Sequence, residues 1–574
     1  MALLAHGLLG LSVACQAMGA AAAAVRGSEP CENTATSRRC WGEYSIDTDW
    51  LEEAPRTGNT REYWLTAEET VLAPDGYLRP VMAFNGSIPG PTIEADWETI
   101  TSIHWHGMHQ KGSVAHDGVP GVTQCPIVPG STMTYRFQAT QYGTAWYHSH
   151  FSLQLAEGLF GPIVIHGPAT ANYDVDLGPV MVMDWPHVTA WETWETYQHR
   201  LALVQPVAAN GLINGMNPYD CSKTQDPACV GNTTARYEVS FEKGLKYRFR
   251  VIGAQTDGYM KFAIDDHKLT VIAADLVPIR PYQADSIILA SGQRYDVIVE
   301  ADQPIGNYWL RAIYQTACNN NDNDNKDNIL GIVRYAGADT ESELTTTVNR
   351  AITNSCGDEP AESLVPWVAH EVGSADVRET IGVGWYYELD LVFKWTLHGK
   401  TLVVNWSEPT LLGVYKEKGL ERLEFPSESN VVTLDAADQW VYWIIQDLGL
   451  VNAYHPLHLH GHDFYVLAQG RGAFVPGLVE LNTRNPPRRD TVTLYGNGYT
   501  VIAFKTDNPG SWLFHCHIAW HASQGLAMQV VERASEIPGL LADDAADMDR
   551  ACRDWAPFYH SPDQADDEQD DSGI

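Results

Sequence analysis

Residues 511–526, "SWLFHCHIAWHASQGL", place one cysteine between two histidines and add a third histidine five positions after the cysteine. On a β-strand, residues i and i+2 point to the same face about 6.6 Å apart, and residue i+1 points to the opposite face. His515 and His517 are therefore expected to face one metal site and Cys516 another. A few covalent bonds would join the two sites, which gives an electron a short path from a thiolate to two imidazoles.

Further histidines are paired in the same way. Five His-X-His pairs occur: His104/His106, His148/His150, His458/His460, His460/His462 and His515/His517. The chain has three β-rich blocks, and the pairs fall only in the first (61–170) and the third (391–533). A single pair of this kind is more often a surface or core feature. The clustering of five pairs in two blocks favours metal binding.

The ligand types select the metal. A cysteine with two histidines and a weak or absent axial group is the blue-copper donor set. Cys516 and His521 share one short segment, and His455, which precedes "PLHLHGH", is the best candidate for the distant histidine. Leu526 stands where an axial ligand is expected and does not coordinate, so the predicted site is three-coordinate and favours Cu(I). A Cys-His₂ zinc site is the alternative, but it leaves the other paired histidines unexplained.

The composition indicates turn-rich β structure. The chain has 574 residues, with 47 glycines, 31 prolines, 19 tryptophans and 26 tyrosines. This length exceeds what a single core holds, and this profile suits strands better than helical bundles. The formal net charge of −35 argues against nucleic-acid binding, which needs a basic face. It is typical of a soluble extracellular protein.

The N-terminus predicts export. Residues 1–25 form an apolar run that ends in small residues, which is the pattern of a secretory signal peptide. A membrane anchor is the alternative, but the run is short and alanine-rich. We therefore expect a secreted protein, extracellular or associated with the cell wall, in an oxidising compartment. Three sequons suit glycosylation there: Asn85, Asn232 and Asn405.

The cysteine count fits that compartment. With Cys15 in the signal peptide and Cys516 in the metal motif set aside, an even number remains for disulfides. These eight are Cys31, Cys40, Cys125, Cys221, Cys229, Cys318, Cys356 and Cys552. The sequence alone does not choose the pairing, although Cys31–Cys40 and Cys221–Cys229 are close enough to close local loops.

Alternation of apolar and polar residues with period two predicts an all-β protein whose blocks form sandwiches or barrels. The expected organisation is a signal peptide (1–25), an N-terminal segment (26–60), a first β domain (61–170), a second (171–337), a linker (338–390), a third β domain (391–533) and an acidic, partly helical tail (534–574).

Four motifs then carry a family resemblance. "SIHWHGMHQ" (102–110), "WYHSHFS" (146–152), "HPLHLHGHDF" (455–464) and "HCHIAWH" (515–521) resemble the copper motifs of multicopper oxidases, specifically of ascomycete laccases. The resemblance extends from residue 29 to residue 574, through segments such as "GQRYDV" and "NPPRRDT". It implies three consecutive cupredoxin-like Greek-key domains and four copper ions: one type 1, one type 2 and two type 3. The type 2 and type 3 ions would form a trinuclear cluster between the first and third domains.

The resemblance also implies the ligands. Type 1 copper would be held by His455, Cys516 and His521, with Leu526 axial and non-coordinating. Type 2 copper would be held by His104 and His458. The type 3 pair would be held by His106, His148, His150, His460, His515 and His517. His462 matches a motif position that is not a ligand and is given a structural role.

The reaction implied is one-electron oxidation of phenols at type 1 copper, coupled to four-electron reduction of O₂ to water at the cluster. Asp117 matches a proton-relay aspartate, although it could instead cap a glycine turn. Asp257 matches an acid that accepts the phenolic proton, although it could instead be a solvated loop residue. Electrons are expected to arrive at His521 rather than at His455.

Several alternatives stay open at this point. A narrower enzyme would be a phenol-coupling oxidase of fungal polyketide or pigment biosynthesis, of the dihydrogeodin oxidase kind. Ferroxidases carry an acid where Ala519 stands, and ascorbate oxidases carry methionine where Leu526 stands. A non-catalytic copper-binding protein belongs to another class. The expected partners are a phenolic small molecule and O₂, with no nucleic acid, no membrane and a monomeric chain.

By the same resemblance, Ile574 ends a segment that plugs the solvent channel of the cluster; a disordered acidic tail is the alternative. Cys125–Cys552 would tie the tail to the first domain, Cys31–Cys40 would pin the N-terminus, and Cys318–Cys356 would brace the second domain and linker.

One departure from the family pattern concerns residues 97–101, where the family has a strand and turn of a dozen or more residues. Losing that strand is expected to leave ladder groups unpaired and to misplace His104 and His106. Either the first domain compensates or the sequence lacks a coding segment.

Overall fold

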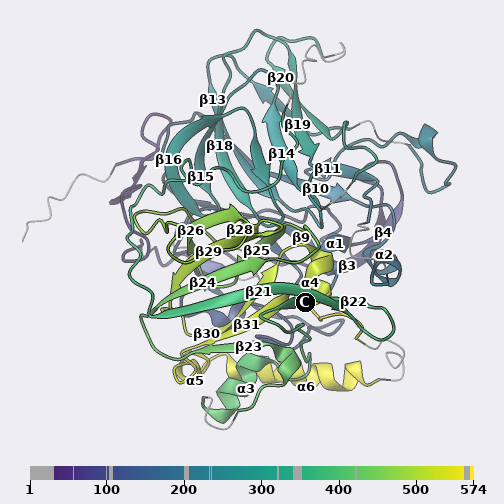
Figure 1. The fold of residues 1–574 in the computed structure, drawn as a ribbon. Coiled ribbons are helices and arrows are strands. Elements are labelled where there is room, and N and C mark those ends of the chain that lie inside the picture. The colour runs from purple at the N-terminus through teal and green to yellow at the C-terminus, as the bar shows by residue number, and fades with distance from the viewer. Residues whose placement is uncertain are drawn as a thin grey trace, which may run out of the picture.

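The computed structural model describes residues 31–55, 57–97, 100–101, 108–199, 206–231, 233, 235–319, 322–340, 352–419, 423–561 and 569–574. Strands dominate these residues, and the helices are short apart from one in the tail (Figure 1). His104, His106, Asn232 and the expected signal peptide lie outside the described residues.

The second domain is a sandwich of a six-stranded and a five-stranded sheet. Its strands are β10 (Val175–Trp185), β11 (Asn210–Ile213), β12 (Glu238–Phe241), β13 (Lys246–Gly253), β14 (Met260–Ile264), β15 (Leu269–Ala274), β16 (Val277–Ala284), β17 (Ile287–Leu289), β18 (Arg294–Glu300), β19 (Asn307–Tyr314) and β20 (Leu330–Tyr335). The order is β11-β10-β13-β18-β15-β16 in one sheet and β12-β20-β19-β14-β17 in the other.

The third domain repeats this plan. Its strands are β21 (Val377–Tyr387), β22 (Phe393–Leu397), β23 (Val431–Leu434), β24 (Trp440–Asp447), β25 (His455–Leu459), β26 (Phe464–Arg471), β27 (Arg488–Arg489), β28 (Thr491–Leu494), β29 (Gly498–Lys505), β30 (Gly510–Cys516) and β31 (Ala527–Glu532). The orders β22-β21-β24-β29-β26-β27 and β23-β31-β30-β25-β28 match those of the second domain strand for strand.

The first domain has smaller sheets. A three-stranded sheet has the order β5-β9-β8, and two pairs are β3-β4 and β6-β7. These strands are β3 (Ala67–Leu72), β4 (Arg79–Phe84), β5 (Ile93–Asp96), β6 (Ile100–Thr101), β7 (Phe137–Gln138), β8 (Gly143–His148) and β9 (Phe160–His166). A hairpin, β1 (Cys40–Trp41) and β2 (Tyr44–Ser45), precedes them.

The segment 97–101 is short, but the three of its residues that the structure describes still find hydrogen-bond partners. Trp97 is fully buried, its backbone N–H donates to His166 O at 2.8 Å, and its indole N–H donates to Thr140 O at 2.6 Å. Ile100 and Thr101 form β6 and pair with β7. The expected loss of backbone pairing is therefore not seen at these three residues.

The expected linker differs from the structure. Within 338–390, β21 pairs in parallel with β24 and antiparallel with β22, so the third-domain sheet begins before residue 391. The strand reads "VRETIGVGWYY", in which three polar residues and two glycines interrupt the apolar ones, and β21 is half-exposed. This composition hid the strand from a search for apolar runs.

Side-chain alternation explains how the domains join. On β13, Tyr247, Phe249 and Val251 point into the second-domain core. Arg248 and Arg250 point to the other face, where burial requires partners. There Arg248 pairs with Asp296, and the Arg250 Nη1 atom donates to the Thr144 hydroxyl of the first domain at 3.1 Å.

A second buried joint reaches the third domain. Arg294 on β18 donates two hydrogen bonds of 2.6 Å to Asp490, and its Nε donates to Thr144 O at 3.2 Å. Arg489 pairs with Asp275 at 3.0 Å. Residues from all three domains thus share one ion-pair network, which fixes the domains around the space where the metal motifs meet.

The helices are few and short. They are α1 (Gln154–Glu157), α2 (Ala190–Tyr197), α3 (Thr410–Glu417), α4 (Ala519–Ser523), α5 (Ile537–Leu540) and α6 (Ala545–Tyr559), with 3₁₀ turns η1 (Val114–His116), η2 (Cys221–Lys223) and η3 (Ser427–Ser429). None of the helices in the described residues is long and apolar enough to cross a membrane.

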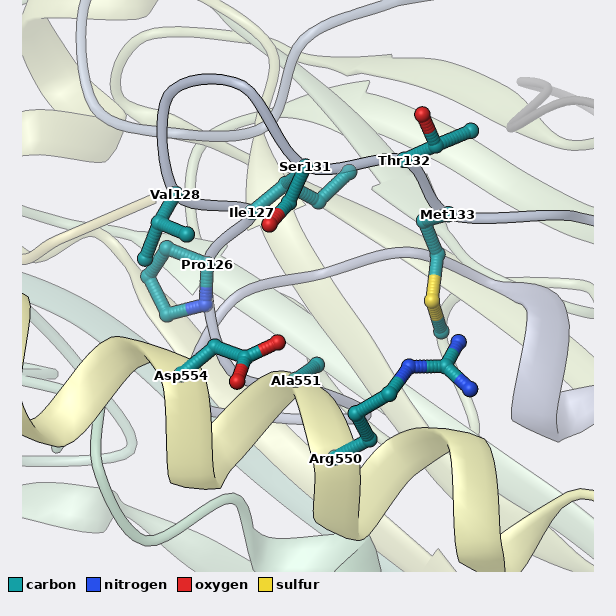
Figure 2. Close-up of a pocket in the computed structure, with 9 residues that line it drawn as sticks. All are labelled: Pro126, Ile127, Val128, Ser131, Thr132, Met133, Arg550, Ala551 and Asp554. Carbon is teal, nitrogen blue, oxygen red and sulfur yellow. The ribbon is translucent and has the colours of Figure 1, made fainter.

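The tail packs onto the first domain. A cavity of about 130 Å³ separates α6 from a loop, and Figure 2 shows Arg550 and Asp554 projecting from α6 toward that loop. The cavity is lined by Pro126, Ile127, Val128, Ser131, Thr132, Met133, Arg550, Ala551 and Asp554. The cavity lies beside the Cys125–Cys552 disulfide, and its lining contains neither histidine nor cysteine.

The structure forms four disulfides among the described cysteines: Cys31–Cys40, Cys125–Cys552, Cys221–Cys229 and Cys318–Cys356. Cys125–Cys552 joins residues 427 positions apart and fixes α6 to the first domain.

Candidate copper centres

The first centre gathers Cys516 from β30, His455 from β25 and His521 from α4. The Nδ1 atoms of His455 and His521 lie 3.7 Å and 3.5 Å from Cys516 Sγ, and they lie 3.1 Å from each other. All three residues are fully buried. Among the described cysteines, only Cys516 is outside a disulfide. The three donor atoms converge as a His₂Cys copper site requires.

Local structure explains this convergence. After β30, the short helix α4 returns the chain so that His521 lies beside Cys516. The Leu526 N–H donates to His521 O at 2.9 Å, and the Cys516 N–H donates to Leu526 O at 3.0 Å. Leu526 is fully buried in the same apolar cluster as Cys516. It lies next to the site and offers no side-chain donor atom.

The protonation states of these groups suit a metal. Burial lowers the pKa of His455 to about 3 and holds the pKa of His521 well below its ordinary value, so both imidazoles are neutral. Burial, and then the charge of Asp257, raise the pKa of the Cys516 thiol. A metal cation is what stabilises a thiolate in such a place. The donor set therefore fits copper.

The second centre brings together six of the eight histidines expected at the cluster. They are His148, His150, His458, His460, His515 and His517, and all are buried. Ring centroids lie 4.8 Å apart for His150–His460, 5.1 Å for His150–His515 and 5.3 Å for His148–His517. His104 and His106, the other two, lie outside the described residues.

Hydrogen bonds orient these rings. Backbone carbonyls accept from three Nδ1 atoms: from His148 at 2.9 Å, from His515 at 2.9 Å and from His458 at 2.7 Å. The His517 Nδ1 atom lies 2.9 Å from the Ser291 hydroxyl. Fixing a histidine tautomer through its other nitrogen is the usual way in which proteins aim a metal ligand.

His460 and His515 give the clearest test of metal fit. Nδ1 of His460 lies 3.0 Å from the Asp117 carboxylate, and Nδ1 of His515 lies 2.9 Å from Cys516 O. Each Nδ1 therefore carries the proton, and each Nε2 presents a lone pair. The two Nε2 atoms lie 3.3 Å apart. Two lone pairs directed at each other repel in a buried site, and a metal cation held by both nitrogens would remove that repulsion.

Strand register connects the two centres. β25 and β30 are antiparallel partners, with His458 opposite His515 and Leu457 opposite Cys516. His515 and His517 lie in the second centre, and Cys516 lies in the first. The expected division of this tripeptide between two sites is therefore what the backbone produces.

Most of the chain also matches models of one known protein family. Three family models described as multicopper oxidase match residues 66–170, 176–338 and 403–536. Together these spans cover more than half of the chain, and each contains strands of one of the three domains.

The chain belongs to the multicopper oxidase family. Laccase-2 from Botryotinia fuckeliana is 48% identical over 95% of this chain and 94% of that protein. Dihydrogeodin oxidase from Aspergillus terreus is 39% identical over 95% of this chain and 96% of that protein. The crystal structure of laccase from Botrytis aclada superposes with a TM-score of 0.88, at 48% identity, over 95% of this chain and 100% of that chain. The expected all-β fold of three cupredoxin-like domains and the expected laccase-like copper oxidoreductase are confirmed.

The two expected acids lie at different centres of this multicopper oxidase. Asp117 is fully buried and contacts His460. Asp257 is 5% exposed and lies between β13 and β14, directly after Thr256, whose carbonyl accepts from the Ala519 N–H at the start of the helix that carries His521. Burial does not distinguish His521 from His455 as the residue where electrons arrive, since both are fully buried.

The other residues of the prediction lie in different surroundings. His462 Nε2 lies 3.0 Å from the Glu532 carboxylate, consistent with a structural role. Ile574 is 3% exposed. Asn85 and Asn405 are exposed at the surface.

Sequence reasoning missed the residues that hold the ligands. Ser291 lies beside His517, and the backbone of Asp490 holds His458. Both belong to segments quoted for the family resemblance or adjacent to them, "GQRYDV" and "NPPRRDT". Those segments were given no role because a hydroxyl or a backbone carbonyl carries no ligand signature of its own.

Proposed function

We propose that this multicopper oxidase is a laccase-like enzyme that oxidises phenols with O₂ as the acceptor. Bound at the two centres as one type 1, one type 2 and two type 3 ions, copper supplies one-electron oxidation of the phenol and four-electron reduction of O₂ to water. The observation that carries the proposal is the tripeptide His515-Cys516-His517, whose side chains contribute to both buried donor sets.

The ligand assignment follows from the donor sets. His455, Cys516 and His521 would hold the type 1 ion, with Leu526 beside it. The described residues that would hold the other three ions are His148, His150, His458, His460, His515 and His517. We propose that His104 and His106 complete this set, on the strength of their motif.

Two carboxylates would handle protons. Asp257, beside the first centre, would take the phenolic proton, so that the substrate leaves as a neutral phenoxyl radical. Asp117 hydrogen-bonds His460 at 3.0 Å, and this contact supports a role in delivering protons for water formation. The docked tail supports an assignment of Ile574 as a plug, since Trp406 Nε1 donates to Gly573 O at 3.0 Å.

We further propose that the enzyme is a secreted, glycosylated monomer. Four disulfides, two exposed sequons at Asn85 and Asn405, and the apolar N-terminal run support this proposal. Sedimentation of protein purified from culture medium, before and after removal of N-glycans, tests it. Retention inside the cell or a dimeric mass would contradict it.

Oxygen uptake by the copper-loaded protein tests the activity. A simple methoxyphenol is expected to drive rapid uptake, whereas ferrous iron and ascorbate are expected to drive little. A polyketide benzophenone belongs in the same panel, because the relation to dihydrogeodin oxidase favours phenol coupling as a second candidate. Preference for the benzophenone would establish that candidate. A blue protein with no uptake on any phenol would sink both.

A further inference from the structure

Asp184 lies at the end of β10 and is 2% exposed. Its carboxylate accepts hydrogen bonds from three consecutive backbone N–H groups: Thr256 at 2.7 Å, Asp257 at 3.1 Å and Gly258 at 2.8 Å. A carboxylate removed from water needs such donors, and hydrogen bonds to a charged acceptor are the strong ones. One buried side chain thus fixes the backbone of the loop between β13 and β14.

This loop carries Asp257, the acid proposed to take the phenolic proton. A three-point hydrogen-bond contact leaves the backbone little freedom to rotate, so it sets the direction of the Asp257 side chain. Packing adds to the constraint, because a Cβ at Gly258 would overlap the ring of Tyr314. The loop is therefore held on one side by Asp184 and on the other by β19.

The same loop contacts both candidate copper centres. The Ala519 N–H, at the start of the helix that carries His521, donates to Thr256 O at 3.0 Å. The Ser291 hydroxyl donates to Gln255 O and also lies 2.9 Å from the His517 Nδ1 atom. Residues 255 and 256 are therefore held against the two centres by hydrogen bonds that do not involve Asp184. Loss of the Asp184 carboxylate is expected to free mainly residues 257 and 258, and no atom of Asp184 is itself a ligand.

We propose that Asp184 is a positioning residue for phenol oxidation: it clamps the loop so that the Asp257 carboxylate meets the phenolic hydroxyl beside His521. The proposal rests on the proposed function, in which Asp257 takes the proton while the phenol loses an electron. Asp184 itself exchanges no proton with substrate. Its contribution to kcat/KM is restricted to electron-donating substrates that must also lose a proton.

The test compares two electron donors with copper-loaded Asp184→Asn. Asparagine offers one acceptor oxygen and turns an NH₂ group toward backbone N–H groups, so the clamp opens. The expected kcat/KM for a methoxyphenol falls by about 10- to 100-fold, as when a reacting group is misplaced by about an ångström. Ferrocyanide has no proton to lose, and its kcat/KM is expected to stay within about 2-fold, because the redox centres are retained. The absorption near 600 nm reports the type 1 site and is expected to stay.

Asp174 provides a matched control. It caps the opposite end of the same parallel strand pair, where its carboxylate accepts from the Lys246 N–H at 2.8 Å. It precedes β10, whereas Asp184 lies at the end of that strand. Asp174→Asn is expected to leave the ratio of phenol to ferrocyanide activity unchanged. Asp257→Asn is expected to give the full loss of kcat/KM for the methoxyphenol. The Asp184→Asn/Asp257→Asn double variant is expected to lose no more than Asp257→Asn alone, because both substitutions act through the Asp257 carboxylate.

Equal loss of activity toward phenol and ferrocyanide would overturn the proposal, and so would no loss toward phenol. Failure of the unsubstituted enzyme to oxidise any phenol would instead overturn the proposed function. If Asp184→Asn does not accumulate, Asp184→Glu keeps the charge while displacing it by one methylene, and the same selective loss is expected. Hydrogen exchange of the unsubstituted protein needs no variant: slow exchange at residues 256–258 is expected, and fast exchange there would refute the clamp.

Discussion

The second and third domains have the same strand order in both sheets, yet within the described residues of these two domains the candidate copper ligands all lie in the third. β14 and β25 occupy equivalent places, as do β19 and β30. β14 reads "MKFAI" and β19 reads "NYWLRAIY", whereas β25 reads "HPLHL" and β30 reads "GSWLFHC". The fold provides two adjacent strands at a suitable distance, and side chains alone decide whether that place is a metal site or an apolar core.

The second domain nevertheless contributes residues that contact both candidate centres. Its loops supply Ser291 to the cluster and Asp257 to the type 1 region, and its arginines join the other two domains. The second domain, whose described residues include no candidate ligand, thus orients the candidate ligands of its neighbour. Four experiments test this division of roles, in order of expected effect.

The largest effect is expected from Cys516→Ser. Loss of the thiolate removes the soft ligand of the first centre and the sulfur at which the electron path to the second centre begins, so the absorption near 600 nm and the turnover of phenols should both vanish. The control is Ala312→Ser, which places a hydroxyl in β19, the equivalent strand of the second domain. It should leave absorption unchanged. Retained blue colour in the Cys516 variant would refute the assignment of this centre.

Removing copper should affect the two domains unequally. A ligand present at a thousand times its Kd stabilises the folded state by about 4 kcal/mol. Chelation is therefore expected to speed amide exchange on β25 and β30 while leaving β14 and β19 near their original rates. Hydrogen-exchange mass spectrometry before and after chelation measures the difference. Equal loosening of both domains would indicate that the ligand sets do not belong to the third domain.

Arg294→Met should break the joint between the second and third domains. The substitution leaves the buried Asp490 carboxylate without its bidentate partner, at a cost of about 3–5 kcal/mol. Because the Asp490 backbone holds His458, type 2 copper occupancy should fall as well. Arg334→Met is the matched control: its partner Glu238 is 40% exposed, so about 1 kcal/mol or less is expected. Chemical denaturation and metal analysis report both quantities, and equal destabilisation by the two variants would contradict the joint.

The smallest effect is expected for the C-terminal tail, which docks against the third domain and has no counterpart on the second domain. Figure 1 shows the C-terminus beside α4 and β22, and the Ser572 N–H donates to Ser523 O at 2.8 Å. Burial raises the pKa of Asp571 to about 6, so the docked tail favours the protonated carboxyl. The favourable free energy of tail docking is therefore at its full value below about pH 4. It weakens by on the order of 2–3 kcal/mol as the pH rises through about 6.

Release of Ile574 by a carboxypeptidase should accordingly be faster at about pH 8 than at about pH 5, relative to an unstructured peptide. Asp571→Asn should abolish this pH dependence, because no charge then forms in the buried site. Its exposed neighbour gives the control, and Asp570→Asn should retain the dependence. Faster relative release at the lower pH would show that the tail is held differently.

The sequence by itself determined the donor chemistry. The alternation in "HCH" separates Cys516 from its neighbouring histidines for any extended strand, since side chains on a strand alternate between faces. The placement of His455 and His458 similarly follows from one strand, β25, because residues three apart on a strand lie on opposite faces. Local geometry of this kind depends on neighbours in the chain, and so it was predictable together with the ligand types and the family.

Only the tertiary structure decided which backbone and carboxylate groups orient those ligands. Asp184, Ser291 and the carbonyl of Asp490 act across distances of dozens to hundreds of residues, and nothing in their own segments marks the contact. The limit of the linker was misjudged for the same reason, because β21 joins the third-domain sheet by pairing with β24, and nothing in its own segment marks that pairing. Buried polar groups must find partners wherever the fold places them, and that placement is set by the whole chain.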